Sequence, residues 1–311
     1  MSEGRQPKDL QGLLRFCVEN TVSEDAPSSS STEAMDKEKQ EFLSKVLSAT
    51  QSLDPVNQLK TAIDYLMSKL NESLESPEEI ERIVDDIIID IIGQSDFAND
   101  FFKLRGIQLI NKCLSSDIRI VRTKGFEMLA EAVQNNPTGQ SMVLETDLLK
   151  RMTLILDESS DDVIRVKSLY AISCLIRENT LAAEYFQTGS DGLNVLLRVI
   201  QSDKSSIKLR TKICFLISSL CQSSLGMQES LFRLGFHRKL IAILNQEHDP
   251  SHEYIAMALR SMIGFEKTRQ DCLGPDISLL SLVNSRIEEF EGKEDFLEEV
   301  DIYKDIVQIC S

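Results

Sequence analysis

The chain has 311 residues, a formal net charge of −16, 42% hydrophobic residues and no tryptophan. Its acidic balance, with no clustered basic footprint to offset it, excludes nucleic acid from the expected partners. No window approaches the roughly 18 consecutive apolar residues of a membrane-spanning helix, so no membrane association is expected. Scarce glycine and proline and few alternating β-branched runs predict an all-α protein.

The cysteines and the N-terminal residues indicate the cellular compartment of the protein. Seven cysteines are an odd number, and none belongs to a C-x-x-C pair, which predicts buried, reduced thiols rather than a disulfide framework. The N-terminus, MSEGRQPKDLQGLLRF, has neither a basic start before a long apolar core nor a small-residue cleavage site, so no secretory signal is expected. We therefore predict a cytosolic protein, with the nucleus as the alternative.

The first 40 residues divide into two segments. Residues 1–22 contain a short amphipathic segment with Leu10, Leu13, Leu14 and Cys17 at helical spacing. Residues 23–40, SEDAPSSSSTEAMDKEKQ, are polar, serine-rich and acidic, and they cannot bury enough apolar surface to become ordered. We therefore predict a disordered N-terminal segment that ends in a linker.

Helical pattern resumes over residues 41–76, which we expect to form N-terminal capping helices. The next helix is predicted to begin at Pro77, because Pro suits a first helical turn and Ser76 can accept a hydrogen bond from the Glu79 amide. From this point to residue 283 the sequence predicts a repeat array.

The repeat has a period of 41 to 45 residues. A turn residue before an apolar helix recurs with spacings of 41, 45 and 43 residues, at Gly106, Asp147, Gly192 and Gly235. A second series, within longer helices, has spacings of 41, 43, 45 and 42 residues: Ile88, Leu129, Ile172, Ile217 and Leu259. This period, with about three helices per unit, predicts an armadillo-repeat right-handed solenoid whose repeats pack only against their neighbours.

The segment IRVKSLYAISCLIREN, residues 164–179, is apolar on almost every side. We predict that it forms the inner long helix of a middle repeat, because a helix with this pattern must be buried on both sides. Arg165, near the helix start, is expected to pair within the stack. One narrow stripe on this helix should face the concave groove, and it contains Lys167, Tyr170, Cys174 and Arg177.

Equivalent stripes on the neighbouring long helices supply the other groove candidates. They are Lys124, Glu127, Glu131 and Gln134 before this helix, and Lys212, Phe215, Ser219, Gln222, Tyr254, Met257 and Ser261 after it. Peptide-binding armadillo proteins hold extended ligands with Trp-x-x-x-Asn ladders, which this stripe lacks. A folded partner is therefore predicted, with Lys167 and Arg177 meeting its acidic or carbonyl groups.

The sequence predicts neither enzymatic activity nor a cofactor. His248 and His252 have the four-residue spacing of a helical zinc pair, but an intervening proline and the lack of a third nearby ligand favour a turn without metal. The carboxylates of Asp85, Asp86 and Asp90 lie near a helix start, where a solvated acidic face is the ordinary interpretation. Motifs of a nucleophile or a phosphate-binding loop do not appear.

The C-terminal residues 284–311 are strongly acidic, with eight carboxylates between Glu288 and Asp301. The favoured interpretation is an acidic capping helix that closes the stack, since solenoids need polar end caps. The alternative is a separate acidic docking site. A monomer is expected, because no heptad seam is long enough for a coiled coil.

Two segments resemble a known family. LQGLLRFCVENT at residues 10–21 and DVIRVKSLYAISCLIRE at residues 162–178 closely resemble the armadillo-type nucleotide exchange factors of heat-shock protein 70, of the cytosolic heat-shock-protein-70-binding kind. The resemblance covers nearly the whole chain. In LETDLL, Asp147 replaces the family's glycine, and Asp tolerates the left-handed conformation better than most residues.

This resemblance implies a co-chaperone whose groove grips one lobe of the chaperone's ATPase domain. By favouring the open conformer, which binds ADP less well, it would release the nucleotide. It also implies that the N-terminal segment occupies the chaperone's substrate-binding domain and promotes client release, through Leu13, Leu14, Phe16, Val18 and Asn20. Two alternatives remain: an armadillo scaffold for another protein, and an N-terminal segment that only caps the first repeat.

Overall fold

The structure is a computed structural model that describes residues 54–70, 77–277 and 279–311, all within one compact unit, Ser52–Ser311. In this part of the chain every regular element is helical. The all-α prediction is confirmed, whereas the predicted disordered segment and linker, residues 1–40, lie outside the described residues.

The helices fall into three sets whose members recur once per repeat. The long helices are α8 (Arg119–Val133), α11 (Asp162–Ile176), α14 (Ile207–Ser223), α17 (His252–Ile263) and α20 (Leu297–Cys310). The middle helices are α7 (Gly106–Leu114), α10 (Leu148–Glu158), α13 (Gly192–Gln201), α16 (Phe236–Leu244) and α19 (Leu279–Phe290). The first helices are α6 (Ser95–Lys103), α9 (Pro137–Leu144), α12 (Thr180–Thr188), α15 (Leu225–Arg233) and α18 (Glu266–Cys272).

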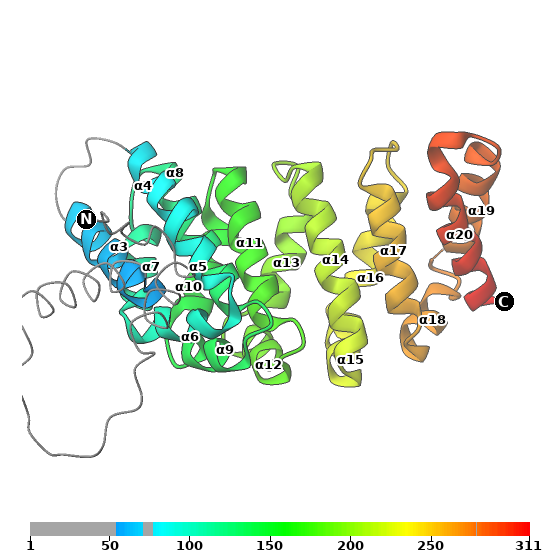
Figure 1. Cartoon of the computed structure of the whole chain (residues 1–311). Coiled ribbons are helices and arrows are strands. Elements are labelled where there is room, and N and C mark those ends of the chain that lie inside the picture. Colours follow the sequence, from blue (N-terminus) through cyan, green and yellow to red (C-terminus); the bar gives the residue numbers. More distant parts are fainter. Residues whose placement is uncertain (1–53, 71–76, 278) are drawn as a thin grey trace, which may run out of the picture. The chain divides into compact units, whose positions relative to one another are not determined.

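Each long helix packs against the long helices before and after it, so that α8, α11, α14, α17 and α20 stand side by side in chain order (Figure 1). The core runs along this row. In α11, for example, Leu169, Ile172 and Leu175 are at most 1% exposed. The prediction that this apolar helix is buried between neighbouring repeats is confirmed.

Arg165 pairs within the stack, as predicted. Its side chain is 6% exposed, and its guanidinium donates hydrogen bonds to the Leu156 carbonyl (3.1 Å) and to the Ser205 hydroxyl (3.3 Å). Leu156 lies in α10 and Ser205 in the loop between α13 and α14, so one buried cation joins consecutive repeats.

Short polar side chains cap the start of several of these helices. Asp161 accepts from the Val163 amide at 2.9 Å, Asn179 from the Ala182 amide at 3.0 Å, and Ser224 from the Met227 amide at 3.1 Å. Such caps satisfy backbone donors that have no partner within the helix. The repeat boundaries are therefore encoded locally.

The turn residues used as sequence markers have two different roles. At Gly192 an added Cβ would lie 2.3 Å from the Phe186 ring, and at Gly106 it would lie 2.5 Å from the Phe101 ring, so both glycines allow an aromatic side chain to approach. The left-handed residues are instead Arg105, Asp191 and Gly235. Asp147 has a φ of −88°, so it needs no left-handed tolerance, and that expectation is wrong.

The N-terminal part of the described chain contains α3 (Pro55–Lys69), which packs on α6 and α7. It is followed by α4 (Pro77–Ile83), the π-helical segment η1 (Val84–Ile89) and α5 (Asp90–Ile92), and α4 and η1 pack on α8. The predicted start at Pro77 is confirmed, whereas Ser76 lies outside the described residues. Of the expected capping helices over residues 41–76, the structure describes α3.

The acidic C-terminus does not form one helix. The predicted boundary between residues 283 and 284 falls inside α19, and a break with Gly292 at φ 82° and the short η2 (Glu294–Phe296) separates α19 from α20. The α18–α20 segment therefore repeats the three-helix pattern, with α20 packed on α17 and α19. The stack ends in a helix pair rather than in a single capping helix.

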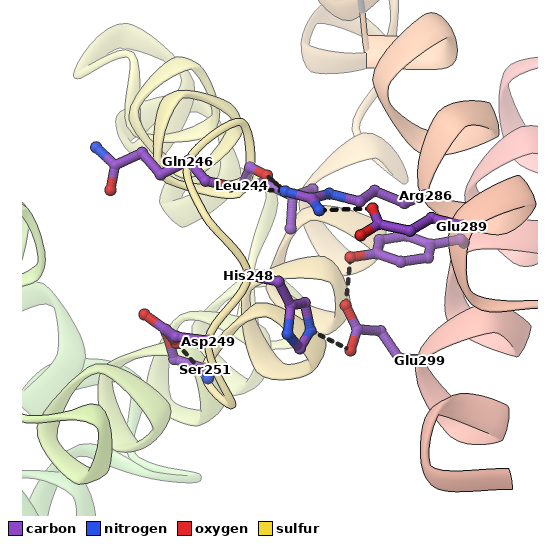
Figure 2. Close-up of polar contacts among 9 residues, drawn as sticks. Leu244, Gln246, His248, Asp249, Ser251, Arg286, Glu289 and Glu299 are labelled. Atoms are coloured by element: carbon purple, nitrogen blue, oxygen red, sulfur yellow. Dashed lines mark hydrogen bonds and ion pairs between the residues drawn. The ribbon is translucent and has the colours of Figure 1, made fainter. Parts of the chain in front are cut away.

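Polar contacts attach this last unit to the preceding one (Figure 2). From α19, Arg286 donates to the carbonyls of Gln246 (2.6 Å) and Leu244 (3.2 Å), at the end of α16. His248 Nε2 lies 3.0 Å from an Oε of Glu299, which also accepts from the Tyr303 hydroxyl at 2.5 Å. The turn predicted around His248 is therefore a partly buried attachment point, because Phe290 and Phe296 also pack on its ring.

No helix within the described residues has the length and apolarity that crossing a membrane requires.

Candidate functional site

The predicted stripe residues lie on consecutive long helices and meet across the helix boundaries. We call this surface the α8–α17 strip. It consists of Lys124, Glu127, Glu131 and Gln134 on or just after α8, Lys167, Tyr170, Cys174 and Arg177 on or just after α11, Lys212, Phe215, Ser219 and Gln222 on α14, and Tyr254, Met257 and Ser261 on α17.

At the N-terminal end of the strip, Lys124 is engaged within the fold. Its side chain is 9% exposed, and its ammonium lies 2.7 Å from Asp85, 2.9 Å from Glu127 and 3.3 Å from Glu81. Burial alone would lower the pKa of Lys124, but its hydrogen bonds to Asp85 and Glu127 raise it. The structure therefore argues against the predicted partner contact for Lys124, because its carboxylate partners already surround it.

Lys167 is also paired. Its ammonium binds the Glu127 carboxylate on α8, which therefore lies between two cations. Burial opposes ionisation of Glu127, but the hydrogen bonds from Lys167 and Lys124 outweigh it and lower the pKa of this carboxyl. Lys167 is thus already paired with an internal carboxylate, and its contact with acidic or carbonyl groups of a partner stays a prediction.

The centre of the strip contains a pocket of about 270 Å³ between the ends of α8 and α11. The Tyr170 hydroxyl donates to the Gln134 side-chain carbonyl at 3.3 Å, and Arg177 donates to the Ser173 hydroxyl at 3.2 Å. Burial and the neighbouring Cys174 raise the pKa of Tyr170 to about 12, so its hydroxyl stays protonated. The pocket lining consists of Gln134, Asn135, Pro137, Gln140, Tyr170, Ser173, Cys174, Arg177 and Glu178.

Lys212, on α14, contacts the ring of Tyr170, which lines this pocket. Its ammonium lies 5.4 Å from the centroid of the Tyr170 ring, a cation–π contact. Burial and then the neighbouring cations Lys208 and Lys167 lower the pKa of Lys212. Within the described part of the chain, no carboxylate forms an ion pair with Lys212 or Arg177.

Further along, the strip becomes aromatic and apolar. Phe215 is 45% exposed, and its ring lies 5.2 Å from that of Tyr254 on the next long helix. Ser219 and Met257 are partly buried, and the Ser261 hydroxyl donates to the Met257 carbonyl at 3.1 Å. This half offers ring and thioether surface rather than charge.

The remaining predicted residues belong elsewhere. Leu13, Leu14, Phe16, Val18 and Asn20 lie outside the described residues. Among those described, no group of three or more metal-binding side chains could hold an ion.

Two charged residues that the predicted stripes did not include also belong to this surface. Asp85 binds Lys124 from 39 residues earlier, and Lys208 adds charge beside Lys212. The Lys167–Glu127 pair is likewise separated by 40 residues. A search for opposite charges one repeat apart would have found both pairs.

Two family models match the chain. The model of the SIL1/FES1/HPBP1 C-terminal domain matches residues 97–231, from α6 to α15, and the model of the nucleotide exchange factor Fes1 matches residues 10–101. Hsp70-binding protein 1 of Mus musculus is 28% identical over 316 residues, which covers 98% of this chain and 87% of that protein. The chain is thus similar to the family of Hsp70 nucleotide exchange factors and Hsp70-binding proteins.

Other members of this family are also similar. Human Hsp70-binding protein 1 is 28% identical, over 98% of this chain and 86% of its own length. The Hsp70 nucleotide exchange factor fes1 of Schizosaccharomyces pombe is 23% identical, over 76% of this chain and 80% of its own length.

Solved structures confirm the armadillo fold of this chain. A designed armadillo repeat protein superposes with a TM-score of 0.62 at 11% identity, covering 81% of this chain and 100% of that one. An engineered protein superposes with a TM-score of 0.65 at 12% identity, and the match covers 81% of this chain and 98% of that protein. At these identities the likeness concerns the fold alone.

Proposed function

We propose that this chain is a nucleotide exchange factor for Hsp70 chaperones. The observation that carries the proposal is the match to proteins named Hsp70-binding protein 1 over 98% of the chain. The proposed activity is binding rather than catalysis. For such binding the strip offers a long row of polar and aromatic side chains.

The α8–α17 strip is the proposed contact surface for the chaperone's ATPase domain. Tyr170 and Phe215 are more than a third exposed, and they lie on adjacent long helices that pack on one another. Because these helices are packed on one another, the side chains of the strip are already held in position before a partner binds. If it binds the open conformer of the ATPase domain better than the closed one, it must weaken ADP binding by the same factor.

The N-terminal segment is proposed to act separately, at the chaperone's substrate-binding domain. Leu13, Leu14 and Phe16 place large apolar side chains ahead of the 18-residue stretch 23–40. A flexible chain of that length spans about 20–25 Å, so it could hold the segment near a neighbouring domain of the same chaperone. We also propose that the protein acts in the cytosol and as a monomer.

The decisive experiment measures release of a fluorescent ADP analogue from full-length Hsp70. The full chain should accelerate release, whereas a scaffold for another partner would have no effect. Deleting residues 1–22 should leave ADP release unchanged while a labelled client peptide dissociates more slowly. The same two results are expected when alanine replaces Leu13, Leu14 and Phe16 together.

Two outcomes would contradict the proposal. No acceleration by the wild-type chain would refute the exchange function. If the deletion abolished ADP release or lowered the melting temperature, the segment would belong to the fold or to the grip, and its separate role would be refuted.

A further inference from the structure

The cations at the centre of the strip are unbalanced, although the chain as a whole carries a net charge of −16. Several cations on the long helices are neutralised across repeats, as in Lys124–Asp85, Lys167–Glu127, Arg210–Asp249 and Arg260–Asp305. Lys212 and Arg177 form no such pair with any described residue. Other cations on these helices also lack an ion pair among the residues described, but Lys212 contacts the ring of Tyr170 and Arg177 lines the pocket beside it.

The unbalanced charge has a cost. Lys212 is partly buried, and Lys208, Lys167 and Arg177 all repel its ammonium, which lowers its pKa. The folded state therefore keeps these four cations close together. A carboxylate on the neighbouring repeat, paired with Lys212, would have relieved their repulsion. Perturbed cations on an exposed surface are typical of functional sites.

The surrounding geometry fits one kind of group. Tyr170 holds Lys212 by its ring face, and Arg177 and the Ser173 hydroxyl line the adjacent pocket of about 270 Å³. The acid nearest in sequence to Arg177 is Glu178, which is exposed and forms no ion pair with it. A small anionic side chain could enter between two cations of different geometry, one a guanidinium fork and the other an ammonium.

We propose that Lys212 and Arg177 form a socket for a carboxylate side chain of the Hsp70 ATPase domain, with Tyr170 as its floor. This inference rests on the proposed exchange function and specifies the chemistry of its contact. It also revises the expected pair of contact residues, because Lys212 replaces Lys167. The carboxylate would provide the counter-charge that the fold omits.

The test uses the full chain, full-length Hsp70 and a fluorescent ADP analogue. Lys212→Met keeps the length of the side chain and removes its charge, so it should slow exchange by about three- to fivefold. Its melting temperature should equal or exceed that of the wild type, because the like-charge repulsion is gone. Arg177→Glu with Lys212→Glu should slow exchange by about tenfold or more, through repulsion of the carboxylate.

A matched control separates the socket from overall charge. Lys150→Glu with Lys239→Glu makes the same change in net charge at two exposed lysines of α10 and α16, outside the strip. Exchange by this variant should match the wild type. In addition, raising the salt concentration should slow wild-type association with Hsp70 more than it slows association of the Lys212→Met, Arg177→Gln variant.

Three results would overturn the inference. The first is an ADP-release rate equal to that of the wild type for the folded Lys212→Met, Arg177→Gln variant. The second is that the Lys150→Glu, Lys239→Glu control slows ADP release as much as the Arg177→Glu, Lys212→Glu variant does. The third is a melting temperature of Lys212→Met below that of the wild type. The first two would leave the exchange function standing if the wild-type chain still released ADP. Failure of the wild-type chain itself would refute both proposals.

Discussion

At the scale of single residues, the strip contains two kinds of charge. Lys124 and Lys167 are held by carboxylates from neighbouring helices, so they stabilise the contacts between repeats. Lys212 and Arg177 lie on the same strip without such partners. A cation is paired when the neighbouring repeat places a carboxylate beside it. The paired cations stabilise the fold, whereas the cations without a carboxylate remain available to a partner.

Lys124→Met tests the first kind. It would leave Glu81, Asp85 and Glu127 facing one another without their shared cation, so we expect a loss of about 2–4 kcal/mol in the free energy of unfolding, measured with urea. Adding Asp85→Asn should recover part of that loss. Lys103→Met is the control, since its ion pair with Asp100 is exposed and should contribute less than about 0.5 kcal/mol. A Lys124→Met variant as stable as the wild type would contradict this assignment.

At the scale of elements, one loop adds polar and aromatic contacts to the packing of α20 on α17, which attaches the last unit. The His248 ring packs against Phe290 and Phe296, and its Nε2 lies beside the Glu299 carboxylate. Arg286 donates to the carbonyls of Leu244 and Gln246, at the end of α16 (Figure 2). The end unit of a repeat protein has a neighbour on one side only. Its resistance to local opening therefore depends on its contacts with that one neighbour, and the loop supplies part of them.

His248→Ala should loosen this attachment. It would leave the Glu299 carboxylate, whose side chain is 5% exposed, with Tyr303 as its remaining hydrogen-bond partner, at a cost of about 1–3 kcal/mol. Amide hydrogen exchange over residues 279–310 should then quicken by about five- to a hundredfold, while amides of α8, α11 and α14 keep their rates. Lys304→Ala, which breaks an exposed pair with Glu291 on the same unit, should change nothing measurable. Uniform quickening along the chain would contradict a local attachment.

At the scale of the whole molecule, two buried histidines make stability depend on pH. His252 is fully buried with both ring nitrogens unpartnered, and burial lowers its pKa below 6.5. Asp249 and Glu299 oppose that shift, and His248 and Arg286 add to it. Burial also lowers the pKa of His237, against the opposing Asp271. The unfolded chain therefore binds more protons than the folded one below about pH 6.5.

We expect the free energy of unfolding to be highest above pH 6.5 and to fall towards pH 5. Each histidine contributes a slope of at most about 1.4 kcal/mol per pH unit. Glu253, whose pKa is raised by burial and by Glu298, opposes part of this slope. His252→Phe should flatten it in urea titrations at pH 7.5, 6.5 and 5.5. An unchanged slope in that variant would show that His252 does not carry it.

The sequence by itself determined the repeat architecture of this protein. Helical periodicity, short polar caps and a period of 41 to 45 residues are local or regular signals, and they were sufficient to predict the burial of α11, the internal pairing of Arg165 and the stripe on each long helix. Only the tertiary structure decided which stripe residues are already paired, because their partners lie about 40 residues earlier, in the preceding repeat. The same holds for His248 and Glu299, which are 51 residues apart, so the predicted turn became a partly buried attachment. Pairing across repeats depends on the register between helices, which packing sets and which no local pattern records.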